Sequence, residues 1–204
     1  MSSILLITSS PRGADSLSTS VATDLAEKLK AQTGATIVHR DLSEKPLAHM
    51  DGVFTSAIRK AADDRSSAES VAAAVSDELT HELLAADTLV IGTGLINFNI
   101  YSSLKTWIDH VARAGLTFKY GESGPVGLAT VKKAYIVLAS GGVYSTGPAV
   151  SMNHAVPYLK SVLGFMGITD VETVYVEGLA YGPEAAEKSV AAAHAKVAEL
   201  AQAA

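Results

Sequence analysis

Buried β-strands and amphipathic helices alternate five times along this chain, and this alternation restricts the fold more than any other feature. Five short apolar segments have the composition of strands: Ile4–Thr8, Ala35–His39, Thr88–Thr93, Ala134–Ala139 and Val171–Val176. The first, third and fourth are nearly uninterrupted apolar runs, which is typical of strands covered on both faces. The segments between them have helical periodicity, as where Leu104, Trp107, Ile108 and Val111 recur at i, i+3, i+4 and i+7.

Alternating strands and helices predict right-handed crossovers and therefore a parallel sheet with helices on both faces. For five strands we expect the doubly wound order 2-1-3-4-5, whose ligand crevice lies beyond the carboxyl ends of the first, third and fourth strands. The chain has 204 residues and no internal repeat, so we expect a single α/β domain over residues 1–204. Segments 41–67 and 116–129 exceed ordinary connections, which favours a role at a site or an interface.

Composition excludes several classes of function. The chain has no cysteine, which excludes disulfides, thiolate metal sites and cysteine nucleophiles. A net charge of −5 with scattered basic residues argues against nucleic-acid binding. The histidines have no metal-ligand spacing and no GxSxG elbow is present, so we predict neither a metal site nor a serine hydrolase. With no signal peptide and no membrane-spanning apolar run, we expect a cytoplasmic protein.

The first turn that can carry chemistry is residues 9–18, Ser-Ser-Pro-Arg-Gly-Ala-Asp-Ser-Leu-Ser, which we name the serine turn. It leads from the first strand into a helix, whose N-terminal N–H groups and partial positive charge suit a phosphate. Ser10, Ser16 and Ser18 add hydroxyl donors. The turn lacks both GxGxxG and GxxxxGK[ST], so a phosphomonoester such as that of FMN fits better than a dinucleotide or a hydrolysed nucleotide. The alternative is an ordinary turn capped by Asp15 or Ser16.

Two further turns are expected at the same edge of the sheet. Residues 95–99, Leu-Ile-Asn-Phe-Asn, form the amide turn, which combines hydrogen-bonding amides with the flat apolar face of Phe98. Residues 139–144, Ala-Ser-Gly-Gly-Val-Tyr, form the glycine turn, where a bare backbone can lie against a flat ligand. Either turn alone could be an ordinary turn that binds no ligand. In the amide turn, Asn97 and Asn99 would then shape the backbone or cap the next helix. Together they favour a planar ligand with a polar edge, such as an isoalloxazine.

Long motifs then give a specific resemblance. The segments NFNI, LKxWIDxVARAGxTFKY, GPxGL, LGFMGITDV and EGLAYGPE resemble the FMN-dependent NADH-azoreductase family, whose flavodoxin-like members also reduce quinones. The match extends from Ile4 nearly to the C-terminus. The resemblance implies an FMN-dependent NAD(P)H oxidoreductase acting on quinones and azo compounds. It also implies a homodimer with one FMN in each subunit and active sites at the subunit boundary.

The resemblance assigns FMN contacts to all three turns. In the serine turn, Ser10, Ser16, Leu17 and Ser18 would hold the phosphate and ribityl chain. In the amide turn, Leu95, Ile96, Asn97 and Phe98 would border the isoalloxazine. In the glycine turn, Ala139, Ser140, Gly141 and Gly142 would lie along its pyrimidine side. The chain departs from the family where tyrosine is common in place of Ile96, and where Ser-Arg is common in place of Ala139-Ser140, which bears on flavin affinity and substrate preference.

The implied mechanism needs no catalytic side chain, because flavin N5 would carry the hydride from NADH or NADPH. A quinone or azo compound would then enter the same pocket, which predicts ping-pong kinetics. Arg59 is a candidate for a nicotinamide pyrophosphate or an anionic dye, and Tyr120 and Phe165 are candidates for stacking on the substrate. For all three, a solvated or core position is the alternative.

Two other functions remain open from the residues alone. A flavodoxin-type electron carrier would bind FMN without turning over a substrate, although the two long segments favour an enzyme. A flavin-free binding protein would share only the scaffold.

Overall fold

The computed structural model describes residues 2–203 and contains a five-stranded parallel sheet in the order β2-β1-β3-β6-β7. These strands are β1 (Ser3–Thr8), β2 (Thr36–Asp41), β3 (Thr88–Gly94), β6 (Lys133–Ala139) and β7 (Val171–Val176). Counted along the main sheet alone, this is the order 2-1-3-4-5, so the predicted topology is confirmed. All five predicted strands are present, and β2 extends two residues beyond its predicted end.

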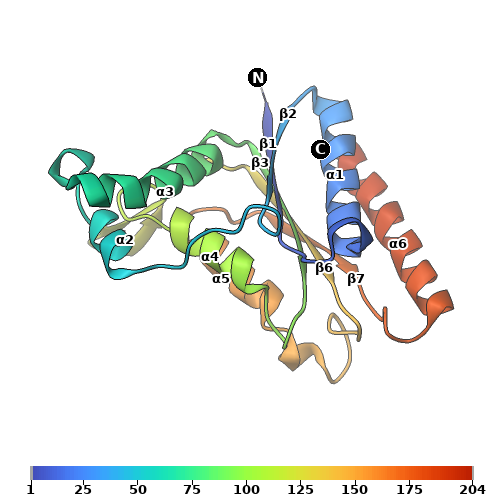
Figure 1. Cartoon of the computed structure of the whole chain (residues 1–204). Helices are drawn as coiled ribbons and strands as arrows, with labels where there is room; N and C mark the ends of the chain where they lie inside the picture. The colour runs from blue at the N-terminus through green and yellow to red at the C-terminus, as the bar shows by residue number, and fades with distance from the viewer. Residues whose placement is uncertain (1, 204) are drawn as a thin grey trace.

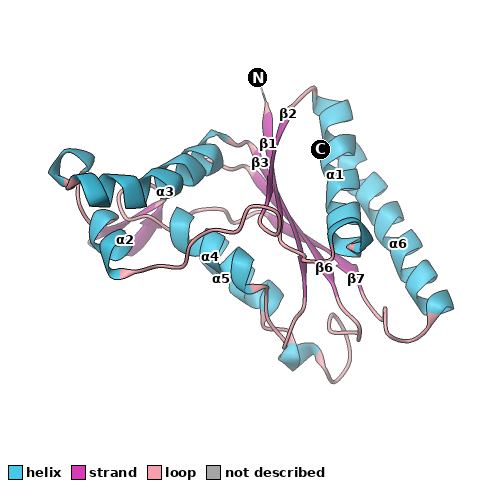
Figure 2. Ribbon diagram, in the orientation of Figure 1, coloured by secondary structure: helices cyan, strands magenta, loops and turns pink. Residues whose placement is uncertain are grey.

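Helices cover both faces of this sheet (Figures 1 and 2). Helices α1 (Leu17–Thr33) and α6 (Pro183–Gln202) pack together on one face. Helices α3 (Ser67–Ala85), α4 (Ser102–Val111) and α5 (Ala155–Phe165) lie on the other face, where the short α2 (Gly52–Ala57) contacts α3. Single 3-10 turns occur at Gly13–Asp15, Ala62–Asp64 and Val150–Met152. Within residues 2–203, none of the helices has both the length and the apolarity to cross a membrane.

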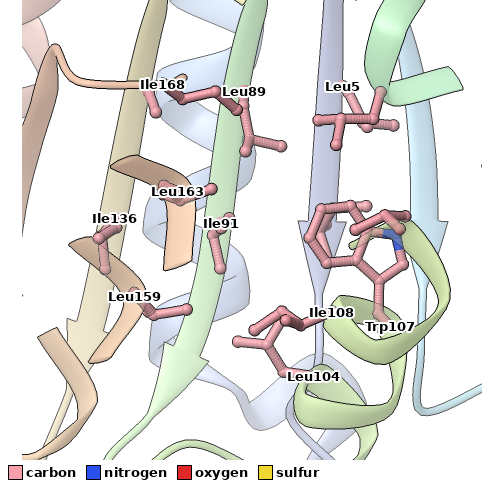
Figure 3. Packing of buried hydrophobic residues seen from close by; sticks show 14 of the residues in the cluster. Leu5, Leu89, Ile91, Leu104, Trp107, Ile108, Ile136, Leu159, Leu163 and Ile168 are labelled. Carbon is pink, nitrogen blue, oxygen red and sulfur yellow. The ribbon is translucent and has the colours of Figure 1, made fainter. Parts of the chain in front are cut away.

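The side chains of β1 show how the two hydrophobic cores arise. Successive strand residues point to opposite faces, so Leu5 and Ile7 enter one core while Ile4 and Leu6 enter the other. Leu5 and Ile7 share their core with Trp107 of α4, which is fully buried. Figure 3 shows α4 and α5 bringing their apolar side chains against this face of the sheet. Burial on both faces explains why β1, like β3 and β6, lacks an alternating polar pattern.

The position of α1 relative to the sheet is fixed at its first turns. Ser16 is the N-cap, and its side chain accepts a hydrogen bond from the Thr19 N–H. Over β3, Gly92 has no space for a side chain, because a Cβ there would lie 2.8 Å from Ala22 Cβ and 3.0 Å from the Ser18 carbonyl oxygen. This close approach places the start of α1 beside the end of β3.

The two long segments contain structure that the sequence pattern did not predict. Segment 41–67 includes α2 and a 3-10 turn, and segment 116–129 forms an antiparallel hairpin of β4 (Phe118–Gly121) and β5 (Gly124–Gly127). The hairpin is pressed onto the turn after α5, since a Cβ at Gly127 would lie 2.1 Å from the Gly167 nitrogen. Seven strands are therefore present in residues 2–203, rather than five.

Helix α3 also differs from its predicted apolar stripe. The i, i+4 repeat of Val71, Val75, Leu79 and Leu83 correctly predicts a helix, but Val71 is 77% exposed and Val75 is 45% exposed. The buried face at this end of the helix comes from small side chains, such as Ala73 and Ser76. Small residues allow α4 to approach closely, and a periodicity of large apolar residues does not detect them.

Candidate functional site

The serine, amide and glycine turns meet at the carboxyl ends of β1, β3 and β6, around a hollow of about 280 Å³. We name it the strand-end hollow. Most of the predicted cofactor residues line it: Ser10, Ser16, Leu17, Ser18, Leu95, Ala139, Ser140 and Gly141. The parallel order of the sheet brings these turns together, because it places β1, β3 and β6 side by side with their carboxyl ends at one edge.

The serine turn provides buried hydroxyl groups at one end of the hollow. Ser10, Ser16 and Ser18 are 4%, 3% and 2% exposed, and the Oγ atoms of Ser16 and Ser18 are 3.2 Å apart. Because α1 begins at Leu17, the N–H groups of Leu17 and Ser18 precede the first intrahelical hydrogen bond. Ser16 also has the alternative role that was predicted for it, because its side chain caps α1. One residue therefore both caps the helix and lines the hollow.

The charge at this end of the hollow is suited to an anion. Arg12 lies at the rim and is exposed, and no aspartate or glutamate belongs to the lining among the described residues. The positive end of the α1 dipole adds to the guanidinium charge. Arg12 belongs to the serine turn but was not predicted as a site residue, because a single exposed arginine in a turn carries no distinguishing signal.

The glycine turn is held by a second loop that follows β7. The N–H groups of Gly178, Leu179 and Ala180 donate to the carbonyl oxygens of Gly142, Ser140 and Gly141, over 3.1, 3.2 and 2.9 Å. Leu179 and Ala180 consequently line the hollow, whereas Gly142 does not. Sequence reasoning missed this loop because it considered only the strands at the crevice. Its one available signal was the position of EGLAYGPE directly after the last strand.

The amide turn lies next to the hollow and is exposed. Ile96 and Asn99 exchange two backbone hydrogen bonds, of 2.8 and 2.9 Å. Between them, Asn97 and Phe98 adopt left-handed φ values of 46° and 67°, which is uncommon for asparagine and strained for a bulky aromatic. Asn97 thus shapes the turn, as one of the alternatives predicted. Capping of the next helix by these asparagines is not seen, because the N-cap of α4 is Tyr101, which makes no side-chain cap bond.

The strained turn presents Phe98 rather than burying it. Phe98 is 40% exposed, and its ring meets the edge of Tyr144 at a centroid distance of 6.2 Å. The Phe98 carbonyl oxygen accepts a hydrogen bond of 2.9 Å from the His154 N–H. Ile96, Asn97 and Phe98 do not themselves line the hollow. They form an exposed shelf that continues from Leu95, which does line it.

The three predicted substrate residues do not line the strand-end hollow. Phe165 and Tyr120 both pack on Phe118, with centroid distances of 4.3 and 5.7 Å, so the structure brings them together at the β4–β5 hairpin. Tyr120 is 75% exposed there. Arg59 lies in a different cavity, beside α3, which Arg65 and Arg113 also line. Their predicted contact with substrate stays a prediction.

Fold and site together define the class to which the chain belongs. Residues 2–201 match the family model described as flavodoxin-like fold. Over the full length of both chains, the sequence is 72% identical to an FMN-dependent NADH:quinone oxidoreductase of Rhizobium johnstonii and 73% identical to one of Agrobacterium fabrum. The chain therefore belongs to the flavodoxin-like family of FMN-dependent NADH:quinone oxidoreductases.

Solved structures agree with this assignment. An azoreductase from Bacillus anthracis is 36% identical and superposes with a TM-score of 0.90, covering 98% of this chain and 99% of the other. A second B. anthracis structure, an FMN-dependent NADH-azoreductase in complex with FMN, is 28% identical with a TM-score of 0.86, covering 98% of this chain and all of the other. The family resemblance found in the sequence motifs is confirmed.

Proposed function

We propose that this protein binds FMN in the strand-end hollow and uses it to pass two electrons from NADH to quinones and azo compounds. The observation that supports this most strongly is the convergence of three turns of different chemistry. Hydroxyl groups line one end, a bare backbone lines another, and the exposed ring of Phe98 stands beside them. A phosphate, a polar ring edge and an apolar ring plane match these three surfaces in turn.

The residues present fit FMN. Ser10, Ser16 and Ser18 offer hydroxyl donors to the phosphate and ribityl chain, and Arg12 offers a charge-assisted hydrogen bond. The turn from Leu95 to Phe98 would border the isoalloxazine. Backbone groups of Ala139, Ser140, Gly141 and Gly142 would lie along the pyrimidine edge. The absence of carboxylates from the described lining removes a source of repulsion for the phosphate.

In this proposal the chain positions its ligands, and FMN when bound supplies the two-electron chemistry. The Ser140 side chain donates to the Gly142 carbonyl oxygen over 2.8 Å, which fixes the backbone of the glycine turn. The amide turn keeps the ring of Phe98 exposed beside the strand-end hollow. This side of the hollow would therefore be open to the nicotinamide first and, after it leaves, to the electron acceptor. This predicts ping-pong kinetics.

We also propose that the protein is a cytoplasmic homodimer. Tyr120 and Phe165 lie at the β4–β5 hairpin and do not line the hollow of their own subunit. Apolar side chains are exposed on and beside this hairpin, including Leu116 and Val126. Association of two copies would cover these side chains and could bring Tyr120, Phe165 and Arg59 towards the active site of the other copy, where we propose that they contact substrate.

The test is to titrate the FMN-free protein with FMN and then to measure NADH oxidation with menadione or methyl red as acceptor. We expect tight FMN binding and NADH oxidation that requires an acceptor, with parallel lines in double-reciprocal plots. Converging lines would contradict the single shared pocket. Bound FMN without NADH oxidation would favour the electron carrier instead, and failure to bind FMN would favour a flavin-free binding protein.

A further inference from the structure

Glu177 holds the start of residues 145–154, the segment that connects the glycine turn to α5, which we name the connecting segment. Glu177 comes directly after Val176, the last residue of β7. One of its carboxylate oxygens accepts a hydrogen bond of 2.8 Å from the Tyr144 N–H, and the other accepts one of 2.5 Å from the Ser145 hydroxyl. Hydrogen bonds to a charged acceptor are stronger than those between neutral groups. The end of β7 is thereby joined to the end of the glycine turn.

Tyr144 contacts both the glycine turn and the amide turn. Its ring meets the ring of Phe98 edge-on, at a centroid distance of 6.2 Å and an interplanar angle of 68°. The Tyr144 ring also lies against Gly142, where an added Cβ would be 3.1 Å from Tyr144 Cε2 and 3.4 Å from its hydroxyl oxygen. The missing side chain at Gly142 therefore leaves space for this ring. We name Phe98 and Tyr144 the aromatic pair.

The far end of the connecting segment is joined to both members of the aromatic pair. Asn153 is 6% exposed, and its Nδ2 donates to the Tyr144 carbonyl oxygen over 3.5 Å, a length at which a hydrogen bond is weak. The His154 N–H donates to the Phe98 carbonyl oxygen over 2.9 Å. The connecting segment consequently links the backbones of Tyr144 and Phe98.

The position of Tyr144 depends on these hydrogen bonds more than on packing. Its ring belongs to neither of the two hydrophobic cores in residues 2–203. In the connecting segment, residues 146–148 are exposed, and nothing lies within 4 Å of a Cβ built at Gly147. The contact from Asn153 is long and neutral, so the hydrogen bond to the Glu177 carboxylate is the stronger of these two restraints on the Tyr144 backbone.

An aromatic ring that is fixed before a ligand arrives favours both binding and reaction. A side chain that is already ordered loses less conformational entropy when a ligand packs against it. A misplacement of about 1 Å can lower the rate of a reaction between bound partners about a hundredfold. A planar ring system that lies along residues 139–142 and beside Phe98 would also meet the ring of Tyr144. The orientation of the aromatic pair therefore affects how planar molecules are held at this side of the hollow.

We propose that Glu177 is a positioning residue for the redox reaction. Through its hydrogen bonds to Tyr144 and Ser145, it fixes the orientation of the aromatic pair, beside which the nicotinamide and the electron acceptor bind in turn. Glu177 acts without lining the strand-end hollow itself. This inference rests on the proposed function, because it concerns the side of the hollow that both substrates approach.

A double-mutant cycle between Glu177→Ala and Tyr144→Ala tests the proposal, with kcat/KM for menadione measured at saturating FMN. Glu177→Gln keeps one acceptor oxygen and nearly the same shape, so it is the conservative variant. Glu172→Ala removes a carboxylate from an exposed position on the same strand and is the control. Hydrogen exchange of the Tyr144 amide in the FMN-free protein reports the hydrogen bond to Glu177 independently of redox activity.

We expect Glu177→Ala to speed exchange of the Tyr144 amide about tenfold or more, because a hydrogen bond to a charged acceptor is lost. It should also lower kcat/KM for menadione about tenfold, as the aromatic pair becomes less well oriented. Glu177→Gln should recover much of this loss, and Glu172→Ala should behave like the unmodified protein. Tyr144→Ala should be impaired at least as strongly as Glu177→Ala. In the Tyr144→Ala background, Glu177→Ala should cause no further loss, since its effect is exerted through Tyr144.

Equal losses from Glu177→Ala in both backgrounds would show that Glu177 acts by another route and would overturn the proposal. The same conclusion would follow if Glu177→Ala left either the Tyr144 exchange rate or kcat/KM unchanged, or if Glu177→Gln were as impaired as Glu177→Ala. In each of these cases the unmodified protein still oxidises NADH, so the proposed function stands. An unmodified protein that oxidises no NADH in the presence of FMN and menadione would overturn both proposals.

Ser145→Ala takes the place of Glu177→Ala in the cycle if the latter does not fold. It removes one of the two hydrogen bonds to the Glu177 carboxylate and leaves the carboxylate itself in place. We expect a smaller loss of kcat/KM than for Glu177→Ala, and no loss in the Tyr144→Ala background. A loss of the same size in both backgrounds would again overturn the proposal.

Discussion

The side chain of Tyr101 lies directly over Gly94, so that a Cβ added at Gly94 would sit 2.9 Å from the Tyr101 hydroxyl oxygen. Both residues line the strand-end hollow. Gly94 is the last residue of β3, and its φ value is not in the left-handed region, so the requirement for glycine is one of space rather than backbone conformation. Tyr101 can therefore reach the hollow only because position 94 has no side chain.

Gly94→Ala should displace the Tyr101 ring and weaken FMN binding. Because a flexible side chain can move aside, we expect little change in the free energy of unfolding but a rise in the FMN dissociation constant of about tenfold or more, the loss typical of a disturbed contact to a charged or polar ligand group. Fluorescence titration with FMN measures this. Gly52→Ala, where nothing lies within 4 Å of the added Cβ, is the control and should bind FMN normally.

Ser16 and Ser18 should differ in their effect on stability. Ser16 both caps α1 and lines the hollow, so Ser16→Ala should lower the free energy of unfolding of the FMN-free protein by about 1 kcal/mol and also weaken FMN binding. Ser18→Ala should weaken FMN binding without the loss of the cap. Ser66→Ala removes the cap of α3, far from the hollow lining, and should cost stability alone. Equal FMN affinity in Ser16→Ala, Ser18→Ala and Ser66→Ala would contradict the proposed contact between FMN and the serine turn.

Phe98→Gly should separate stability from function. The left-handed φ of 67° is strained for phenylalanine and ordinary for glycine. We therefore expect the variant to be at least as stable to urea as the unmodified protein, while NADH oxidation with menadione falls about tenfold or more because the apolar face is lost. A variant that is markedly less stable would show that the contact with Tyr144 outweighs the strain.

Glu69 should make stability depend on acid pH. Its carboxylate accepts hydrogen bonds from Lys60, Ser56 and the Ser66 N–H, and these lower its pKa from 4.5 to about 2. A pKa lowered by folding stabilises the folded state above about 4.5, and this contribution is lost as the pH falls from about 4.5 to about 2.

Glu69→Gln should therefore be less stable than the unmodified protein at neutral pH, and the difference should narrow as the pH falls below about 4.5. Urea unfolding over a series of pH values measures this difference. Glu199→Gln removes an exposed pair with Lys196 on α6 and should show a small difference throughout. A stability difference for Glu69→Gln that is independent of pH would contradict the role of the ionised carboxylate.

The architecture was predictable from the sequence because the three central strands of the main sheet, β1, β3 and β6, are buried on both faces. Runs such as Ile4–Thr8 cannot be surface strands, and their alternation with helices leaves few topologies. The same reasoning brings Ser10, Leu95 and Ser140 to one edge of the sheet. It could not find the β4–β5 hairpin, because the close contact between Gly127 and Gly167 joins segments far apart in the chain and leaves no local periodicity.

Within the site, prediction failed where a residue acts through tertiary packing. Tyr101 reaches the hollow because Gly94 leaves space for it, and neither residue has a distinctive local pattern. Leu179 and Ala180 enter the lining through backbone hydrogen bonds to the glycine turn, which any residue types could form. The exposure of Phe98 depends on the left-handed backbone of its turn, which the sequence suggests only through the two flanking asparagines.

The position of FMN tests the central claim most directly. A crystal structure of the FMN-loaded protein should place the phosphate against the hydroxyls of Ser10, Ser16 and Ser18, with the isoalloxazine beside Phe98 and its pyrimidine edge along residues 139–142. Flavin density outside the strand-end hollow, or a phosphate that contacts none of these serines, would contradict the account.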